Sequence, residues 1–226
     1  MENQTISSQV YTDSFRTPTT DKRYCNYDAM KLWQKMIKRG FDIVGSLFCL
    51  VSLSWLFLII YILVKREDGG NVIFWQERIG KGGKPFHIYK FRTMKENSEG
   101  ATPQLVADGD NDRLTAIGKT LRSHHLDELP QLINVLRGDM SFVGHRPERK
   151  YFIEKILAHD TRYKLLYEIQ PGVTSEATLH NGYTDTMEKM LKRLDQDLYY
   201  LENRTLLMDL KIISATVLSV ISGKKF

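Results

Sequence analysis

The sequence is organised around the stretch Arg122-Ser-His-His-Leu-Asp-Glu-Leu-Pro-Gln-Leu-Ile-Asn-Val-Leu-Arg-Gly-Asp-Met-Ser-Phe-Val-Gly-His-Arg-Pro147. Within it, the adjacent acids Asp127 and Glu128 precede an apolar run with helical spacing, and Pro130 suits the first turn of a helix. We therefore expect both acids at a helix N-terminus, where unpaired N–H groups and the helix dipole favour the ionised form. An ionised carboxylate can act as a nucleophile or as a metal ligand.

The acid pair also fits a plainer interpretation, because acidic residues at helix starts are commonly caps. Side chains at adjacent helical positions point about 100° apart, so the pair is not placed to flank one bond as glycosidase carboxylates do. Different roles for Asp127 and Glu128 fit better. Arg122 and Arg146 lie on either side of the pair in sequence, and arginines can hold a phosphate.

Length, charge and cysteine content narrow the class of protein. A chain of 226 residues with 42% hydrophobic content can form one catalytic unit with a folded core. The net charge of +5 suits a membrane surface, a nucleotide or a nucleic acid, and charge alone does not choose among them. Cys25 and Cys49 form neither a disulfide framework nor a zinc pattern, which favours a reducing compartment.

The strongest compositional signal is the apolar run from Ile43 to Val64, which contains no charged residue. At 1.5 Å per residue it is long enough to cross a hydrocarbon core of roughly 30 Å. Residues 29–41 before it have amphipathic helical spacing with several lysines, typical of an interfacial helix or of a plain surface helix.

The orientation of this run is left open, because basic pairs lie at both 38–39 and 65–66. One arrangement enters and leaves by the same face, and the other is a straight span. Ser52 and Ser54 lie midway, where their hydroxyls can bond carbonyls freed at a bend. Against a bend, no proline or glycine follows within the run after residue 47.

The remaining chain predicts a short β-hairpin followed by helices. The residues from Val72 to Ile79 and from Phe86 to Arg92 are β-branched and aromatic, and a glycine-rich turn joins them. Lys90 and Arg92 lie beside aromatics there, as part of a solvated strand face or as phosphate contacts. We expect a polar loop over 95–112 and helices over 113–122, 151–157, 163–169, 184–201 and 206–221.

His124 and His125 raise the alternative of a histidine metal site, as in a metal-dependent hydrolase. Two histidines are weak support for it, and carboxylates beside a phosphate suit Mg²⁺ better than zinc.

Taken together, these features resemble the bacterial sugar transferases, the small monotopic phosphoglycosyl transferases that begin lipid-linked glycan assembly. The resemblance runs from about Lys38 to Ile213 and includes the apolar run. Its motifs are Lys38-Arg-Gly-Phe-Asp42, Tyr89-Lys-Phe-Arg-Thr-Met94, Leu126-Asp-Glu-Leu-Pro-Gln-Leu132, Gly138-Asp-Met-Ser-Phe-Val-Gly144, Arg146-Pro147, Pro171-Gly-Val-Thr174 and Asp209-Leu-Lys-Ile212.

The resemblance implies a mainly helical α/β fold in its minimal form. We expect a flexible polar N-terminus over 1–27, an amphipathic lead-in and membrane-inserted, re-entrant helix over 28–66, and a compact cytosolic catalytic domain with interfacial helices over 67–226. The location implied is the bacterial inner membrane, with the catalytic domain facing the cytoplasm.

The implied substrates are a UDP-sugar and polyprenyl (undecaprenyl) phosphate, with membrane lipid as a partner, no nucleic acid, and homo-oligomerisation left open. Asp127 would attack the β-phosphate of the UDP-sugar, release UMP and carry a covalent phosphosugar that the prenyl phosphate removes. Glu128 would hold Mg²⁺. The residues expected to meet phosphate or nucleotide are Arg122, Arg146, Lys90, Arg92 and Pro147.

The chain departs from the family pattern at three places. Trp55 follows Ser54 where the family has a proline, His145 stands where the family has the first proline of Gly-Pro-Arg-Pro, and residues 175–182 replace a familiar motif. The sugar is therefore not readable from the sequence. A non-catalytic, membrane-anchored adaptor that binds anionic lipid or a partner is the alternative function.

Overall fold

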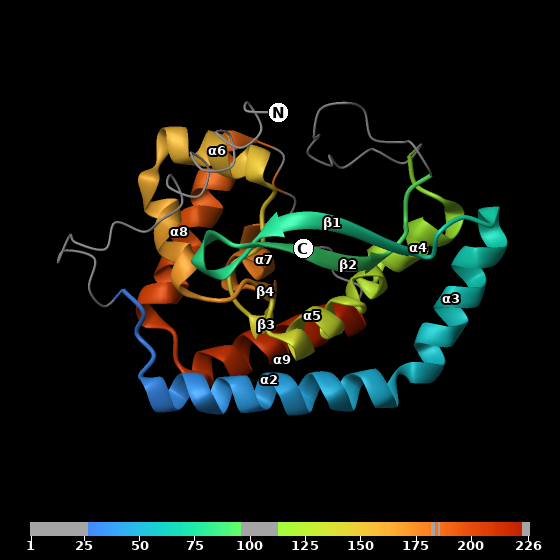
Figure 1. Ribbon diagram of the computed structural model, residues 1–226, viewed down its shortest axis with the longest axis horizontal. Helices are drawn as coiled ribbons and strands as arrows, with labels where there is room; N and C mark the ends of the chain where they lie inside the picture. The colour runs from blue at the N-terminus through green and yellow to red at the C-terminus, as the bar shows by residue number, and fades with distance from the viewer. Residues whose placement is uncertain (1–26, 96–112, 182–183, 185, 223–226) are drawn as a thin grey trace, which may run out of the picture.

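The computed structural model describes residues 27–95, 113–181, 184 and 186–222, which are mainly helical (Figure 1). The flexible polar N-terminus predicted over 1–27 lies outside the described residues apart from Tyr27, and so does the loop predicted over 95–112 apart from Lys95. The elements in chain order are α2 (Leu32–Ser52), α3 (Ser54–Asp68), β1 (Ile73–Ile79), the 3₁₀ helix η2 (Lys81–Gly83), β2 (Pro85–Phe91), α4 (Ala116–Ser123), the 3₁₀ helix η3 (Leu126–Glu128), α5 (Gln131–Arg137), β3 (Ser141–Val143), α6 (Lys150–His159), the 3₁₀ helix η4 (Thr161–Glu168), β4 (Gly172–Thr174), α7 (Glu176–Asn181), α8 (Met187–Asn203) and α9 (Leu206–Ser222).

The apolar run forms the end of α2 and most of α3, which meet at Leu53 with a bend of 61°. The Ser52 hydroxyl donates to the carbonyl oxygens of Phe48 at 2.8 Å and Cys49 at 3.4 Å, so a serine bonds carbonyls at the bend as expected. No single helix of the described residues is long and apolar enough to cross a membrane, although the bent pair passes that test by length and composition.

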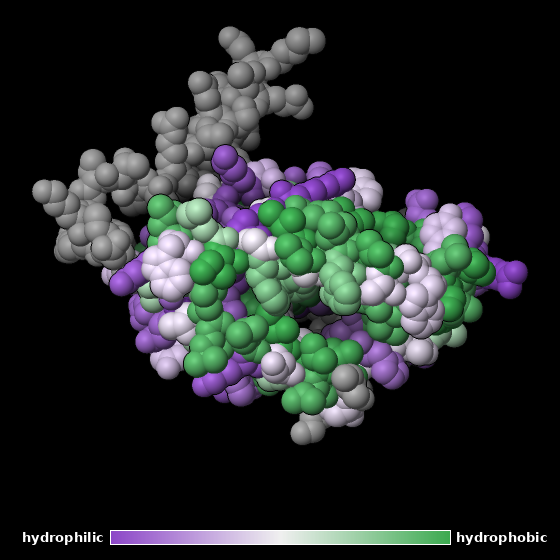
Figure 2. Space-filling model, turned by 90° about the horizontal axis from the view of Figure 1, so that it is seen from below, coloured by the Kyte–Doolittle hydropathy of each residue, from purple (hydrophilic) through white to green (hydrophobic). Residues whose placement is uncertain are grey.

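The bent pair leaves many large apolar side chains exposed. Leu32, Met36, Val44, Phe48 and Trp55 are each between 61% and 75% exposed. Seen from below in Figure 2, hydrophobic side chains gather into a broad area on this side of the molecule. An apolar area of this kind marks an interaction surface on a folded protein.

The predicted hairpin is confirmed. Strands β1 and β2 pair antiparallel, with Trp75 opposite Tyr89 and Phe74 opposite Lys90. The connecting turn places Gly82 at φ 69°, a left-handed conformation that glycine adopts without steric cost. The hairpin lies across the middle of the molecule in Figure 1, above α5.

A second, parallel pairing joins β3 to β4, with Ser141 opposite Gly172 and Val143 opposite Thr174. The sequence did not predict it, because three-residue strands carry too little periodicity to be recognised. At its end the backbones of Gly144 and Gly172 approach so closely that a Cβ on Gly172 would lie 2.1 Å from the Gly144 nitrogen.

The main hydrophobic core lies among α6, η4 and α8, where Ile153, Leu166, Leu194 and Leu201 are almost fully buried. The expected helices over 151–157, 184–201 and 206–221 are present as α6, α8 and α9. The helix expected over 163–169 is present as the 3₁₀ helix η4. One expectation needs correction, because the helix expected over 113–122 begins only at Ala116, after the Thr115 cap.

Candidate active site

The acid pair lies between two helices. Asp127 and Glu128 end the 3₁₀ helix η3, and α5 begins three residues after Glu128, with Pro130 as its N-cap. The acids thus precede the α-helix instead of occupying its first turn. His125, just before η3, has φ 54°, a left-handed conformation that is uncommon outside glycine. The chain turns sharply here and buries the Asp127 side chain.

Strand β2 brings a lysine to this turn. Lys90 Nζ lies 2.5 Å from Glu128 Oε1, and both side chains are about one-fifth exposed, at 20% and 18%. A charge-assisted hydrogen bond of this kind is stronger than one between neutral groups. The structure therefore brings Lys90 to Glu128, two of the residues that we expected in the site.

The two acids differ in their ionisation. Burial raises the pKa of Asp127 and the neighbouring Glu128 adds to the rise, although Lys90 and Arg122 oppose it. Burial also acts to raise the pKa of Glu128, but the charges of Lys90 and Arg146 and the Lys90 hydrogen bond together lower it. We expected a helix N-terminus to favour the ionised form of both acids, and the lowered pKa of Glu128 agrees with this. For Asp127 this expectation was wrong, because desolvation outweighs the nearby positive charges.

The two arginines expected at the site both act on the pair. Arg122 lies in the last turn of α4, and its charge lowers the pKa of Asp127. Arg146 lies beyond β3, and its charge lowers the pKa of Glu128. Positive charges from β2, α4 and the segment after β3 thus act on the acids, and such charges can neutralise a bound diphosphate.

Polar contacts from β1 hold the segment that carries Arg146. The Arg78 Nη1 group donates to the Pro147 carbonyl at 3.2 Å, and the Ile79 N–H donates to the Glu148 carbonyl at 3.2 Å. Pro147 is buried, so in this structure it contributes its backbone carbonyl to the site's support.

Helix α8 holds the same segment from the other side. Arg193 Nη1 donates to Glu148 Oε1 at 3.0 Å, and the Asp197 carboxyl accepts a hydrogen bond from the Arg146 backbone. Burial raises the pKa of Asp197 to about 8. Our reading of the sequence missed Arg193, Asp197, Glu148 and Arg78. A signal was present, since Arg193 and Asp197 stand four residues apart on the side of α8 that carries Leu194 and Leu198.

Arg92 occupies a different place. It is buried and hydrogen-bonds Asp68 at the end of α3, so it ties the bent helix pair to strand β2. Its role as a phosphate contact stays a prediction.

The histidines do not assemble a metal site within the described residues, where no group of three or more His, Cys, Asp and Glu side chains could hold an ion. His124 is exposed and its Nδ1 lies 3.0 Å from the Thr120 carbonyl. His145 is fully buried, and burial lowers its pKa to about 3. Asp127 and Glu128 are consecutive in sequence, and carboxylates suit Mg²⁺ because this ion takes one or two of them together with substrate phosphates.

Similarity to known proteins identifies the family of this chain. The family model described as bacterial sugar transferase matches residues 33–223. The chain is 38% identical over 187 residues to the UDP-N-acetylgalactosamine-undecaprenyl-phosphate N-acetylgalactosaminephosphotransferase of Aeromonas hydrophila, covering 83% of this chain and 44% of that protein. It is 42% identical to a UDP-glucose:undecaprenyl-phosphate glucose-1-phosphate transferase of Klebsiella pneumoniae, covering 80% of this chain and 39% of the relative.

A Caulobacter vibrioides protein of the same name is 38% identical, with 82% of this chain and 70% of the relative covered. The chain thus spans less than half the length of the Aeromonas and Klebsiella relatives and about two thirds of the Caulobacter one. Since the family model covers most of the sequence, the chain belongs to the bacterial sugar transferase family.

Proposed function

We propose that this protein transfers a sugar-1-phosphate from a UDP-sugar to polyprenyl phosphate, in particular undecaprenyl phosphate, and releases UMP. The observation that most strongly supports this reaction is the acid pair. Asp127 is buried, Glu128 is bound to Lys90, and their pKa values are shifted in opposite directions. The names of the relatives support the substrate classes, since each acts on a UDP-sugar and undecaprenyl phosphate. The reaction would be the first membrane step of assembling a glycan such as an exopolysaccharide, capsule, O-antigen or glycoprotein glycan.

In the proposed mechanism, an ionised Asp127 oxygen attacks the β-phosphorus of the UDP-sugar. The bond from that phosphorus to the bridging oxygen breaks, and UMP leaves with the electron pair. An oxygen of polyprenyl phosphate then attacks the phosphorus of the acyl phosphosugar, which releases the Asp127 carboxylate and forms a prenyl diphosphate-sugar. No proton needs to move in either step.

The surrounding residues supply charge and position, which phosphoryl transfer requires more than acid–base chemistry. Lys90, Arg122 and Arg146 would neutralise the phosphate oxygens. Glu128, with the substrate phosphates, would hold Mg²⁺, which when bound neutralises further charge on the diphosphate.

The decisive experiment measures UMP release by purified protein from UDP-sugars, with and without polyprenyl phosphate. Asp127→Asn should abolish release, while Asp195→Asn, the same exchange at an exposed aspartate of α8, should leave it unchanged. With UDP-sugar alone, mass spectrometry should find a phosphosugar on Asp127. Full activity of Asp127→Asn would remove the nucleophile. A membrane-anchored adaptor predicts instead that no UDP-sugar yields UMP.

We also propose that α2 and α3 enter and leave the inner membrane by the same face, with the catalytic residues on the cytoplasmic side. The bend of 61° and the exposed apolar side chains support this topology. In a variant that lacks Cys25 and Cys49, cysteines introduced at Lys31 and Gly70 should both react with a reagent confined to the cytoplasm. Reaction of only one of them would indicate a straight span.

A further inference from the structure

Three charged residues of one turn of α2 all contact the segment 135–143. The first is Arg39, whose Nη1 and Nη2 groups donate to the carbonyl oxygens of Val135 and Leu136 at 2.6 and 2.9 Å. These carbonyls belong to the last turn of α5, where the helix runs out of N–H groups to pair with its carbonyls. The Val135 carbonyl also accepts a hydrogen bond from the Gly138 N–H at 3.1 Å. A guanidinium at this end also complements the negative end of the helix dipole. Arg39 therefore caps the helix that follows the acid pair.

Gly138, the residue after α5, leaves space for the Arg39 guanidinium. Gly138 has φ 93°, and a Cβ at that position would lie 3.2 Å from Arg39 Nη2. Glycine therefore serves two purposes here, because it adopts the left-handed conformation that ends the helix and leaves room for the guanidinium.

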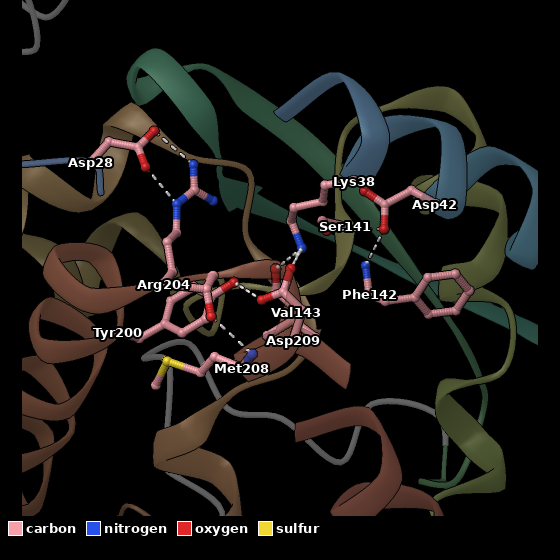
Figure 3. A network of polar contacts seen from close by, with 11 residues as sticks. Asp28, Lys38, Asp42, Ser141, Phe142, Val143, Tyr200, Arg204, Met208 and Asp209 are labelled. Atoms are coloured by element: carbon pink, nitrogen blue, oxygen red, sulfur yellow. Dashed lines mark hydrogen bonds and ion pairs between the residues drawn. The ribbon is translucent and has the colours of Figure 1, made fainter. Parts of the chain in front are cut away.

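Asp42 and Lys38 hold the next part of the segment. Asp42 Oδ1 accepts hydrogen bonds from the Ser141 hydroxyl and from the Phe142 N–H, both at 3.1 Å. Lys38 Nζ donates to the Val143 carbonyl at 3.0 Å and pairs with Asp209 of α9 at 2.7 Å. Figure 3 shows Lys38 pointing toward Asp209 and the Val143 carbonyl, and Asp42 pointing toward the backbone of Phe142.

The network extends away from α2 and is anchored in the body of the protein. Asp209 Oδ1 accepts a hydrogen bond of 2.5 Å from the Tyr200 hydroxyl of α8. Tyr200 is 1% exposed, and Asp209 is 6% exposed. The α2 turn is thus fixed against two other helices, so it can act as a rigid support.

The segment 135–143, which the α2 residues contact, connects the acid pair to Arg146 in the candidate site. It begins in α5, a helix of seven residues whose N-cap stands two residues after Glu128. It ends at Val143, three residues before Arg146. A short helix moves as one body, so a displacement at its capped end is passed to the acids at the other end.

We propose that Lys38, Arg39 and Asp42 are positioning residues, which set the acid pair and Arg146 relative to the membrane-facing helix α2. This inference rests on the proposed function, because it concerns the geometry of that reaction. The three side chains act through the backbone of residues 135–143. The helix that carries the exposed apolar face is thereby the same helix that fixes the catalytic geometry.

A competing explanation is that basic residues beside an apolar helix only orient it in the membrane. Arg39→Lys separates the two, because lysine keeps the positive charge but lacks the planar fork that bonds two carbonyls at once. The matched control is Arg66→Lys, the same exchange at an exposed arginine near the end of α3.

We expect Arg39→Lys to lower kcat roughly ten- to a hundredfold, as a small misplacement of reacting groups does, while KM for the UDP-sugar stays within about twofold. Flotation with phospholipid vesicles should be unchanged, and Arg66→Lys should match the wild type in every assay. Wild-type kcat in Arg39→Lys, or a loss fully explained by weaker vesicle binding, would overturn the proposal.

Two substitutions of Asp42 test whether its acceptor oxygen matters for turnover. Asparagine keeps an acceptor oxygen for the Phe142 N–H, and alanine does not. Asp42→Ala should lose turnover, and Asp42→Asn should recover most of it. An equal loss in both variants would contradict positioning through the acceptor.

Hydrogen exchange provides a readout that does not depend on activity. Backbone amides of residues 131–143 should exchange faster in Arg39→Lys than in Arg66→Lys, because the cap on α5 is weakened. If the wild type released no UMP from any UDP-sugar, the proposed function would fail, and this exchange difference would still decide the positioning role. Identical exchange in the two variants would refute it.

Discussion

Lys90 Nζ of strand β2 lies 2.5 Å from Glu128 Oε1, at the end of the turn that carries the acid pair. The hairpin and the acid turn are 38 residues apart in sequence, and this contact joins them. Lys90 also acts on the neighbouring acid, since its charge opposes the rise that burial produces in the pKa of Asp127. One lysine therefore influences both acids.

The first prediction concerns the pH dependence of the wild-type reaction. Burial raises the pKa of Asp127 above its ordinary value of 3.8, and only the ionised form can attack phosphorus. We expect kcat to rise with pH through this raised pKa and then to level off. A rate already independent of pH just above 3.8 would contradict the assignment. Burial makes the folded chain bind this proton more tightly than the unfolded chain does, so the resulting stabilisation is fully present below pH 3.8 and is lost as the pH rises through the raised pKa.

The second prediction concerns Lys90→Met. Removing the positive charge removes an influence that lowers the pKa of Asp127, so the acidic limb of the pH–rate profile should move to higher pH. The matched control is Lys119→Met at an exposed lysine of α4, which should leave the limb in place. If the limb stayed in place in Lys90→Met as well, the group that titrates in the wild type would not be Asp127.

The third prediction concerns Asp197, which burial holds at a pKa of about 8 against an ordinary 3.8. A raised pKa stabilises the fold fully below 3.8, and this contribution is lost as the pH rises to about 8. Compared with Asp197→Asn, the wild type should therefore lose unfolding free energy steadily across that window. Thermal unfolding of both proteins at several pH values measures the difference. Parallel Tm curves would mean that Asp197 is ionised in the fold.

The fourth prediction tests the close approach of β3 and β4. Gly172→Ala would place a methyl group 2.1 Å from the Gly144 nitrogen and 2.4 Å from the Thr174 carbonyl oxygen. Both neighbours are backbone, so we expect a loss of about 3 kcal/mol or more in unfolding free energy. Gly40→Ala is the control, because a Cβ there meets nothing within 4 Å. It should change stability by no more than about 1 kcal/mol, and similar effects of the two variants would contradict the packing described.

Local pattern was enough to predict much of this protein. Runs of β-branched and aromatic residues on either side of a glycine-rich turn indicated the hairpin, and the spacing of apolar residues indicated α6, α8 and α9. The acid pair and its arginines were candidates because charged residues of both signs flank an apolar run with helical spacing. Ser52 was identified at the bend because a hydroxyl is a local partner for a carbonyl one turn earlier.

The sequence by itself determined which segments fold into helices and hairpin and which side chains could carry the chemistry, since both depend on neighbours a few residues away. Only the tertiary structure decided how those side chains behave. The raised pKa of Asp127 depends on burial, and the support of Arg146 comes from Arg193 and Asp197 on a distant helix. Asp42 reaches Phe142 across 100 residues of sequence. Desolvation and long-range contacts arise only when the chain is packed, and a periodic pattern shows at most which face of a helix is buried, not which distant group it meets.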